Sequence, residues 1–220
     1  MNRLLFLLTN RIGIRTLYKS LYVYQRGKAY KNGRKINTFL IDGRSTLSLG
    51  KKITIKNKGS FQFGISSPSL LVSKQPNVLQ MGENSVLTIN GAVSIGPGVM
   101  LSILNNAQVE FGDNVMINSN SKLICFEKVK IGSNSIIGWD VEICDSSFHK
   151  IISDEFKMAK SIIIGEKVWV GSRASILKGV TIGSGSVVAS CSVVTKDVPE
   201  KCLVAGVPAR IIRKNVKWEL

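Results

Sequence analysis

The sequence is poor in residues that common catalytic and metal centres require. Its 220 residues include one histidine, His149, so a zinc site built from three histidines is excluded. The four cysteines, Cys125, Cys144, Cys191 and Cys202, form no CxxC pair and no framework spacing. Reduced thiols in an intracellular protein are the simplest account of them.

Long apolar runs are also lacking. No stretch approaches the ~18–20 apolar residues of a membrane-spanning helix. The apolar run near the start covers only Leu4–Leu8, which is shorter than the ~7–15 residues of a signal peptide, and no small-residue cleavage site follows. We therefore expect a chain that is not secreted. A GxxxxGK phosphate loop is absent, so nucleotide hydrolysis is not indicated.

Acidic residues are missing from residues 1–41, which hold nine Lys and Arg in a chain of net charge +16. This segment is either a solvated basic face or a segment drawn to an anionic surface such as phospholipid. Within it, Leu17, Tyr18, Leu21 and Tyr22 lie three to four residues apart, which predicts a short amphipathic helix over 14–25. Such a helix can lie on a membrane interface or pack on the body of the fold, and the pattern leaves both open.

The rest of the chain is a repeat of an apolar residue followed by glycine, from about residue 47 onward. The spacing is six residues where it is cleanest, as in Ile164, Val170, Ile176, Ile182, Val188 and Val194. A period of six predicts a parallel β-helix with three hexapeptides per coil and the apolar residues inside. The glycine permits the corner, either because a side chain would clash there or because φ is unusual. Before residue 95 the spacing slips, and we expect less regular coils.

The C-terminal repeats contain the motifs VWVG, GVTIG, SVVTKDVP and AGVPARIIR within residues 162–214. On these motifs the chain resembles the hexapeptide-repeat acyltransferases of left-handed β-helix fold, in particular the sugar and polysaccharide O-acetyltransferases. The resemblance covers about residues 78–214. It implies an all-β, left-handed parallel β-helix, assembled as a homotrimer with acetyl-CoA between neighbouring chains. It also implies acetyl transfer to a sugar hydroxyl of a capsule, lipopolysaccharide or exopolysaccharide building block.

Three regions follow from the repeat. Residues 1–45 are expected to form the basic N-terminal segment with its helix, and residues 46–206 the β-helix. The β-helix is interrupted at 150–161, where KIISDEFKMAKS fits no hexapeptide. Residues 207–220 would form a C-terminal tail or helix.

The resemblance places the catalytic centre at a histidine just before a loop that leaves the coil. His149 continues the series Ile131, Ile137 and Ile143, and the repeat breaks directly after it. A neutral imidazole near pH 7 suits removal of a hydroxyl proton, so His149 is the predicted general base. Asp145 is the predicted carboxylate partner. Related sequences often read Asp-x-Asp-x-His, and Ser147 replaces the second Asp here. The alternative for Asp145 is a turn cap.

The same resemblance assigns the acetyl-CoA side. Small residues would let the pantetheine arm lie against the backbone, and two cations would meet the phosphates. The predicted residues are Gly171, Ser172, Ser190, Thr195, Lys196 and Arg213. The alternatives are a corner requirement of the repeat for the small residues and ordinary exposed cations. Backbone N–H groups at Gly171 and Ser172 are candidates for the oxyanion site. Trp139 is a candidate wall for the acceptor, or else a subunit contact.

Other functions remain as alternatives. The zinc carbonic anhydrase built on the same β-helix needs three histidines, so no metal is expected. A non-catalytic scaffold or interaction module at a membrane surface is the main alternative. No motif supports nucleic-acid binding. The expected location is the cytoplasm, with peripheral contact at the inner face of the membrane through residues 1–40. The acceptor, the choice between O- and N-transfer and the acyl group are left open.

Overall fold

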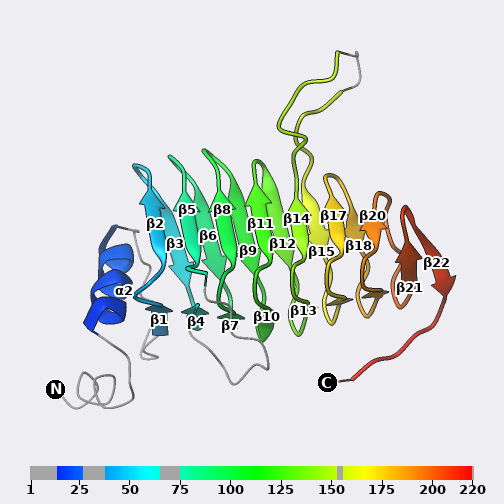
Figure 1. The fold of residues 1–220 in the computed structure, drawn as a ribbon, viewed down its shortest axis with the longest axis horizontal. Coiled ribbons are helices and arrows are strands. Elements are labelled where there is room, and N and C mark those ends of the chain that lie inside the picture. The colour runs from blue at the N-terminus through cyan, green and yellow to red at the C-terminus, as the bar shows by residue number, and fades with distance from the viewer. Residues whose placement is uncertain (1–13, 27–37, 65–74, 153–155, 220) are drawn as a thin grey trace.

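A computed structural model describes residues 14–26, 38–64, 75–152 and 156–219. The chain winds repeatedly around one axis, so that its short strands stack into three parallel sheets along a column (Figure 1). The helix α2 (Ile14–Arg26) lies across one end of the column. The expectations for residues 1–13 and 27–37 lie outside the described residues.

Each coil contributes one strand to each sheet. Sheet A contains β1 (Thr38–Ile41), β4 (Ser60–Phe63), β7 (Ala92–Ile95), β10 (Val115–Ile117), β13 (Ile136–Ile137), β16 (Trp169–Val170), β19 (Val187–Val188), β21 (Leu203–Gly206) and β22 (Ala209–Arg213). Sheet B contains β2 (Thr46–Leu49), β5 (Val78–Met81), β8 (Met100–Ile103), β11 (Lys122–Cys125), β14 (Glu142–Cys144), β17 (Ser175–Leu177) and β20 (Val193–Val194). Sheet C contains β3 (Thr54–Asn57), β6 (Val86–Ile89), β9 (Gln108–Phe111), β12 (Lys128–Ile131), β15 (Ile162–Ile164) and β18 (Thr181–Ile182).

The core is a set of apolar stacks inside the column. In sheet B, Leu101, Leu123, Ile143, Ile176 and Val194 lie in register on successive strands, and each is almost fully buried. The last two are separated in sequence by the length of three hexapeptides, so the predicted β-helix is confirmed. The step from Ile143 to Ile176 contains the long interruption of the repeat.

The early coils are larger rather than irregular. Leu101 pairs with Leu123, and Leu123 pairs with Ile143, so each of these coils holds more residues than the coil from Ile176 to Val194. Strands in the early coils are mostly longer than those in the last coils. Adding two residues to a strand keeps the same side chains pointing inward, because strand side chains alternate with a period of two. The slips in the sequence therefore lengthen the sides of the coil without disturbing the core.

The repeat glycines are needed for close contact between coils. We name the corners by the sheets they join, so that Gly165 lies at a CA corner, between β15 and β16. A Cβ on Gly165 would lie 2.7 Å from the backbone nitrogen of Ser184 in the next coil. The left-handed conformation falls two residues later, at Lys167 with φ of 51°, and at the matching Asn134 with φ of 60°. Of the two reasons considered for glycine, the clash between coils applies here.

Helix α2 covers the open end of the first coil with its polar side. Ser20 Oγ accepts a hydrogen bond from the Ile41 N–H at 2.9 Å, and Thr16 Oγ1 accepts one from the Gly43 N–H at 2.8 Å. Val23 is fully buried beside them. A Cβ on Gly43 would lie 2.7 Å from the Arg15 Cβ, so the missing side chain lets the helix approach. The helix therefore caps the column, as the ends of a solenoid require.

The C-terminal extension contains a strand, where a tail or helix was expected. Strand β22 folds back antiparallel to β21, with Ala209 opposite Gly206 and Arg213 opposite Leu203. The following residues run back along the column past the CA corners (Figure 1), and the Val216 N–H donates to the Lys201 carbonyl at 2.9 Å. No helix occurs in the described residues of this extension.

Candidate active site

The interruption of the repeat forms an arm that projects from the column between β14 and β15 (Figure 1). Ser146 and Ala159 pair as an antiparallel bridge at its base. The Ser147 N–H donates to the Met158 carbonyl at 2.9 Å, which holds the two limbs together. The arm thus leaves the coil at Ser146, before the predicted position of 150. His149 consequently lies on the arm itself.

A tight turn holds the backbone around His149. The Phe148 N–H donates to Ser146 Oγ at 3.0 Å, and the His149 N–H donates to the Ser147 carbonyl at 2.6 Å. The Phe148 ring packs edge-on against Phe126 of the column, with ring centres 5.1 Å apart. The His149 side chain is exposed, so the only imidazole in the chain is presented to solvent from a fixed turn.

The returning limb of the arm is fixed by a cation from the column. The Lys178 ammonium lies 4.0 Å from the centre of the Phe156 ring and also donates to the Lys157 carbonyl. The Lys160 carbonyl accepts a hydrogen bond from the Gly179 N–H at 2.9 Å. Sequence reasoning missed Lys178, Phe126 and Phe148 as supports of the arm, because nothing in the repeat pattern distinguishes them from other outward residues.

Asp145 is fully buried at the base of the arm, and its carboxylate binds backbone N–H groups of the preceding coil. Asp145 Oδ1 accepts from Phe126 at 2.7 Å, and Oδ2 accepts from Glu127 at 2.8 Å and Lys128 at 2.9 Å. Its own carbonyl accepts from the Lys160 N–H at 2.9 Å. These contacts give Asp145 the capping geometry that was the alternative for it. Its pairing with His149 stays a prediction.

The thiol beside this carboxylate is inert at neutral pH. Cys125 Sγ lies 3.5 Å from Asp145 Oδ2 and 3.3 Å from the Gln108 carbonyl. Burial, and secondly the negative charge of Asp145, raise the pKa of the Cys125 thiol far above its usual range. Burial likewise raises the pKa of Cys144. Both thiols are therefore neutral packing groups, and neither is a candidate nucleophile.

Four of the predicted residues lie above one another at the AB corners, where the chain passes from sheet A to sheet B. We call them the AB stack. The backbone N–H of Trp139 donates a hydrogen bond to Ser172 Oγ at 3.2 Å. A Cβ on Gly171 would lie 2.6 Å from the Ser190 backbone nitrogen. Trp139, Gly171, Ser172 and Ser190 thus stack on successive coils. The indole nitrogen of Trp139 is buried and has no hydrogen-bond partner among the described residues.

The remaining predicted residues lie at other edges of the column. Thr195 and Lys196 are exposed after β20, on the side of the BC corners where the arm also leaves. Arg213 is exposed at the end of β22, opposite Leu203 and so near the CA corners. One chain therefore distributes its predicted site residues over three corners.

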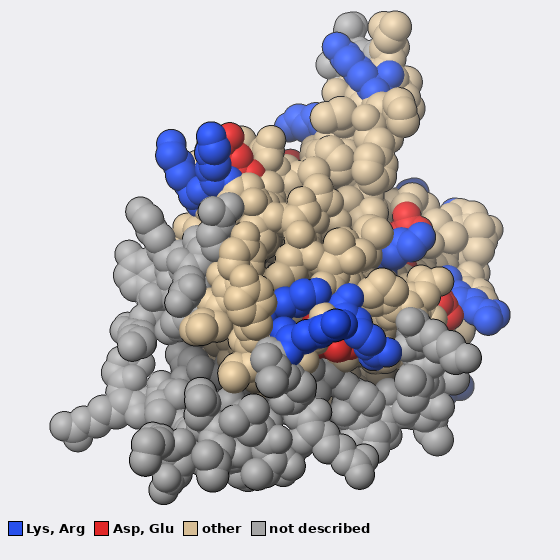
Figure 2. Space-filling view, turned by 60° about the vertical axis from the view of Figure 1, so that its left-hand side comes forward, with Lys and Arg blue, Asp and Glu red and all other residues tan. Residues whose placement is uncertain are grey.

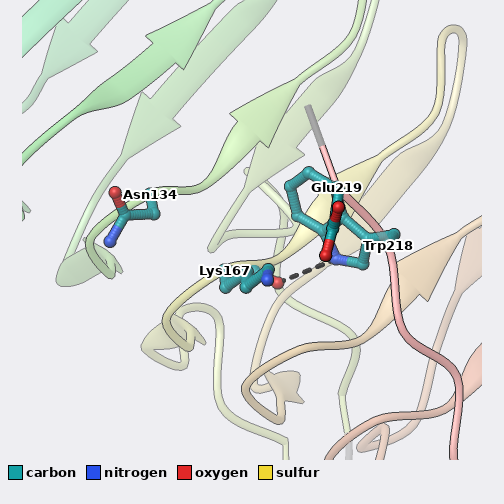
Figure 3. A pocket seen from close by; sticks show the side chains of 4 residues that line it. All are labelled: Asn134, Lys167, Trp218 and Glu219. Carbon is teal, nitrogen blue, oxygen red and sulfur yellow. Dashed lines mark hydrogen bonds between the residues drawn. The ribbon is translucent and has the colours of Figure 1, made fainter.

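A separate pocket lies under the C-terminal tail at the CA corners (Figure 3). It is lined by Asn134, Lys167, Trp218 and Glu219. The Trp218 indole N–H donates to the Lys167 carbonyl at 3.0 Å, and its ring lies 6.1 Å from Trp169. None of the predicted site residues lines this pocket.

Two features are absent from the described part of the chain. Its helices lack the length and apolarity needed to cross a bilayer. No three His, Cys, Asp or Glu side chains gather there in a way that could hold a metal ion.

Known proteins share both the repeat and the fold. Residues 161–196 match the family described as bacterial transferase hexapeptide (six repeats). Galactoside O-acetyltransferase of Escherichia coli (strain K12) is 31% identical over 70% of this chain and 74% of its own. The putative lipopolysaccharide biosynthesis O-acetyl transferase WbbJ of the same strain is 33% identical over 54% of this chain and 67% of its own.

Among solved structures, the polySia specific acetyltransferase NeuO superposes with a TM-score of 0.53. It is 28% identical and covers 80% of this chain and 77% of its own. The relatives share the left-handed β-helix expected from the repeat, and their names describe acetyl transfer. The chain is an acyltransferase that belongs to the hexapeptide-repeat family, in its branch of sugar and polysaccharide O-acetyltransferases.

Proposed function

We propose that the protein transfers the acetyl group of acetyl-CoA to a sugar hydroxyl, with His149 as the general base. The observation that carries this proposal is the placement of the only imidazole, exposed on a braced turn of the arm. The names of the relatives support a carbohydrate acceptor, since they mention a galactoside, lipopolysaccharide biosynthesis and polySia.

The chemistry needs one group that both takes and returns a proton. As the sugar oxygen attacks the thioester carbon, the neutral imidazole of His149 takes the hydroxyl proton. The C–S bond then breaks, and the leaving CoA sulfur receives that proton from the imidazolium. The products are the acetylated sugar and free CoA. Backbone N–H groups of the Gly171 and Ser172 corner would stabilise the developing oxyanion.

Asp145 acts in this proposal as a positioning residue. Its carboxylate fixes the backbone of Phe126, the ring of Phe126 supports Phe148, and Phe148 precedes His149. Its carbonyl holds the returning limb through Lys160. The carboxylate would thus influence the imidazole through the packing of the arm.

A trimer would assemble the separated residues into one site. In a closed threefold ring, one face of each chain meets a different face of its neighbour. The AB stack of one chain, with Trp139, Ser172 and Ser190, would then lie beside the arm or Lys196 of a neighbouring chain. We propose that acetyl-CoA occupies such a groove, with Lys196 and Arg213 at its phosphates.

For the acceptor, we propose a glycan building block carried on a lipid. The protein would then work in the cytoplasm, at the inner face of the membrane. The basic N-terminal segment with its nine Lys and Arg supports that location.

Acetyl-CoA binding can be tested without knowing the acceptor. Thermal or chemical unfolding is followed with and without acetyl-CoA for the wild type and for Lys196→Ala/Arg213→Ala. At about 100 times its Kd, a ligand adds about 2.7 kcal/mol to the free energy of unfolding, and we expect the double variant to lose most of this gain. The matched control is Lys56→Ala/Lys58→Ala, which removes two exposed cations of the first coil.

The role of His149 is then measured in a screen of sugar and amino-sugar acceptors. We expect His149→Ala to keep the acetyl-CoA stabilisation and to lower kcat by about 10²–10⁴-fold. Turnover of amino sugars alone would show that the acceptor group is an amine and not a hydroxyl. The absence of any stabilisation by millimolar acetyl-CoA would favour a non-catalytic scaffold instead.

A further inference from the structure

Helix α2 is docked so that most of its apolar group faces away from the column. Of Leu17, Tyr18, Leu21 and Tyr22, Leu17 is half-buried and the other three are exposed. The side chains buried against the first coil include Thr16, Ser20 and Val23. Tyr18 is 69% exposed, Leu21 53% and Tyr22 40%. Burying apolar side chains is favourable, so the exposed area of Tyr18 and Leu21 in particular indicates a surface that can take a further partner.

The two tyrosines of this face lie against each other. The rings of Tyr18 and Tyr22 are stacked, with centres 6.5 Å apart and planes 13° apart. Leu21 lies between them in the sequence. The helix itself lies across the end of the column, away from the arm (Figure 1). Tyrosine is well suited to a membrane interface, where its ring meets the acyl boundary and its hydroxyl meets water.

The end of the column that carries α2 is strongly basic. Its described residues, 14–26 and 38–64, hold eight Lys and Arg against one acidic residue, Asp42, which pairs with Arg44 at 3.0 Å. The middle of the column, residues 75–152, holds four Lys and Arg against seven Asp and Glu. Figure 2, turned to bring the α2 end forward, shows groups of Lys and Arg across the described surface.

We propose that this end is a docking surface for anionic phospholipid, with Tyr18, Leu21 and Tyr22 inserted at the interface. Cations attract the negative leaflet, and apolar side chains then enter the boundary between headgroups and acyl chains. The absence of acidic residues from 1–41 fits a lipid surface better than a second copy of this chain, since two such basic ends repel each other.

Vesicle flotation of the full-length protein tests this surface. Vesicles of phosphatidylcholine are compared with vesicles in which phosphatidylglycerol replaces part of the phosphatidylcholine. We expect binding to the anionic vesicles only, and weaker binding as NaCl rises from about 0.1 M to 1 M, where the Debye length falls from about 10 Å to 3 Å. The variant Tyr18→Ser/Leu21→Ser/Tyr22→Ser should bind at least tenfold more weakly.

The control variant is Val207→Ser/Ile211→Ser/Ile212→Ser, which changes three exposed apolar residues at the opposite end of the column. It should bind vesicles as the wild type does. Unchanged binding of the α2 variant would overturn the proposal, as would failure of the wild type to float. A change in assembly mass without a change in flotation would assign the face to a contact between copies. This inference extends the membrane location proposed above, which would fail with it. Acetyl-CoA binding in solution does not involve this surface, so acetyl transfer is tested separately.

Discussion

At the residue scale, Asp145 shows how one buried charge organises a site. Three N–H donors from the preceding coil converge on its carboxylate within 2.9 Å, so the charge is compensated although the residue is fully buried. Hydrogen bonds to a charged group are stronger than neutral ones, and leaving such donors unmet in the interior is costly. The base of the arm therefore depends on the Asp145 carboxylate.

Asp145→Asn removes the charge. It also turns a side-chain NH₂ group, which cannot accept, toward the backbone N–H donors of the preceding coil. We expect the free energy of unfolding, measured by urea denaturation, to fall by about 3 kcal/mol. Asp140→Asn is the control, because that residue is exposed and its change should stay within about 0.5 kcal/mol. An unaltered stability of Asp145→Asn would mean that the carboxylate does not hold the corner.

The candidate residues could be named from the sequence, but their contacts could not. The motifs and the break in the repeat pointed to His149 and Asp145 from order along the chain alone. Phe126 belongs to the preceding coil, and only the stacking of coils brings it to Phe148. Contacts of this kind depend on the register between coils, which changes here because the early coils are longer than the late ones.

At the element scale, each corner imposes two constraints: one position must lack a side chain, and another must adopt a positive φ. In the repeat pattern both seemed to be met by glycine. Gly165 is required because the next coil lies too close for a side chain. The left-handed position in the last CA corner is held by Lys201, with φ of 53°, and not by glycine. The period of six predicted where each corner falls. It could not tell which corner residue bears which constraint, because both are read as small or polar positions.

Gly165→Ala and Lys201→Gly should therefore behave in opposite ways. The new Cβ at 165 would meet the backbone nitrogen and the Oγ of Ser184, so we expect a loss of about 2 kcal/mol in the free energy of unfolding. Lys201→Gly places the residue that tolerates positive φ at an exposed corner, and its effect should lie within about 0.5 kcal/mol. Equal effects in thermal unfolding would contradict this division.

The N-terminal helix illustrates a limit of pattern reading. Its periodicity predicted a helix over 14–25, and the structure has one from Ile14 to Arg26. The apolar pattern could not show which face of the helix packs on the column, because the side chains that bind the column there are hydroxyl groups. Ser20 and Thr16 accept N–H groups at the end of the column, which bare apolar side chains could not do.

At the scale of the whole molecule, the arm leaves apolar side chains without cover in a single chain. Ile152 is 95% exposed and Ile151 63%. In the proposed trimer these residues would be buried against a neighbour, which would also bring His149 to the groove. The oligomeric contact lies between chains, so the repeat within one chain does not specify it.

Analytical ultracentrifugation should show an assembly of three chains for the wild type. We expect Ile151→Ser/Ile152→Ser to weaken that assembly at least tenfold, because it removes apolar area from the contact. Tyr18→Ser/Leu21→Ser/Tyr22→Ser should leave the assembly mass unchanged. A wild-type monomer at micromolar concentration would rule out the trimer, and an unaffected isoleucine variant would place its contact elsewhere.

The regular stacking of the coils also fixes the distance between the α2 end of the column and the arm. Parallel strands lie about 4.8 Å apart, and sheet A passes through four such steps from β1 to β13, the strand just before the arm's coil leaves sheet A. The arm therefore stands roughly 20 Å beyond β1, and a lipid surface in contact with α2 would lie further away by the thickness of that helix. Each coil gained or lost between β1 and β13 would move the imidazole by one step. The number of coils thus sets how far from the membrane a tethered sugar must reach.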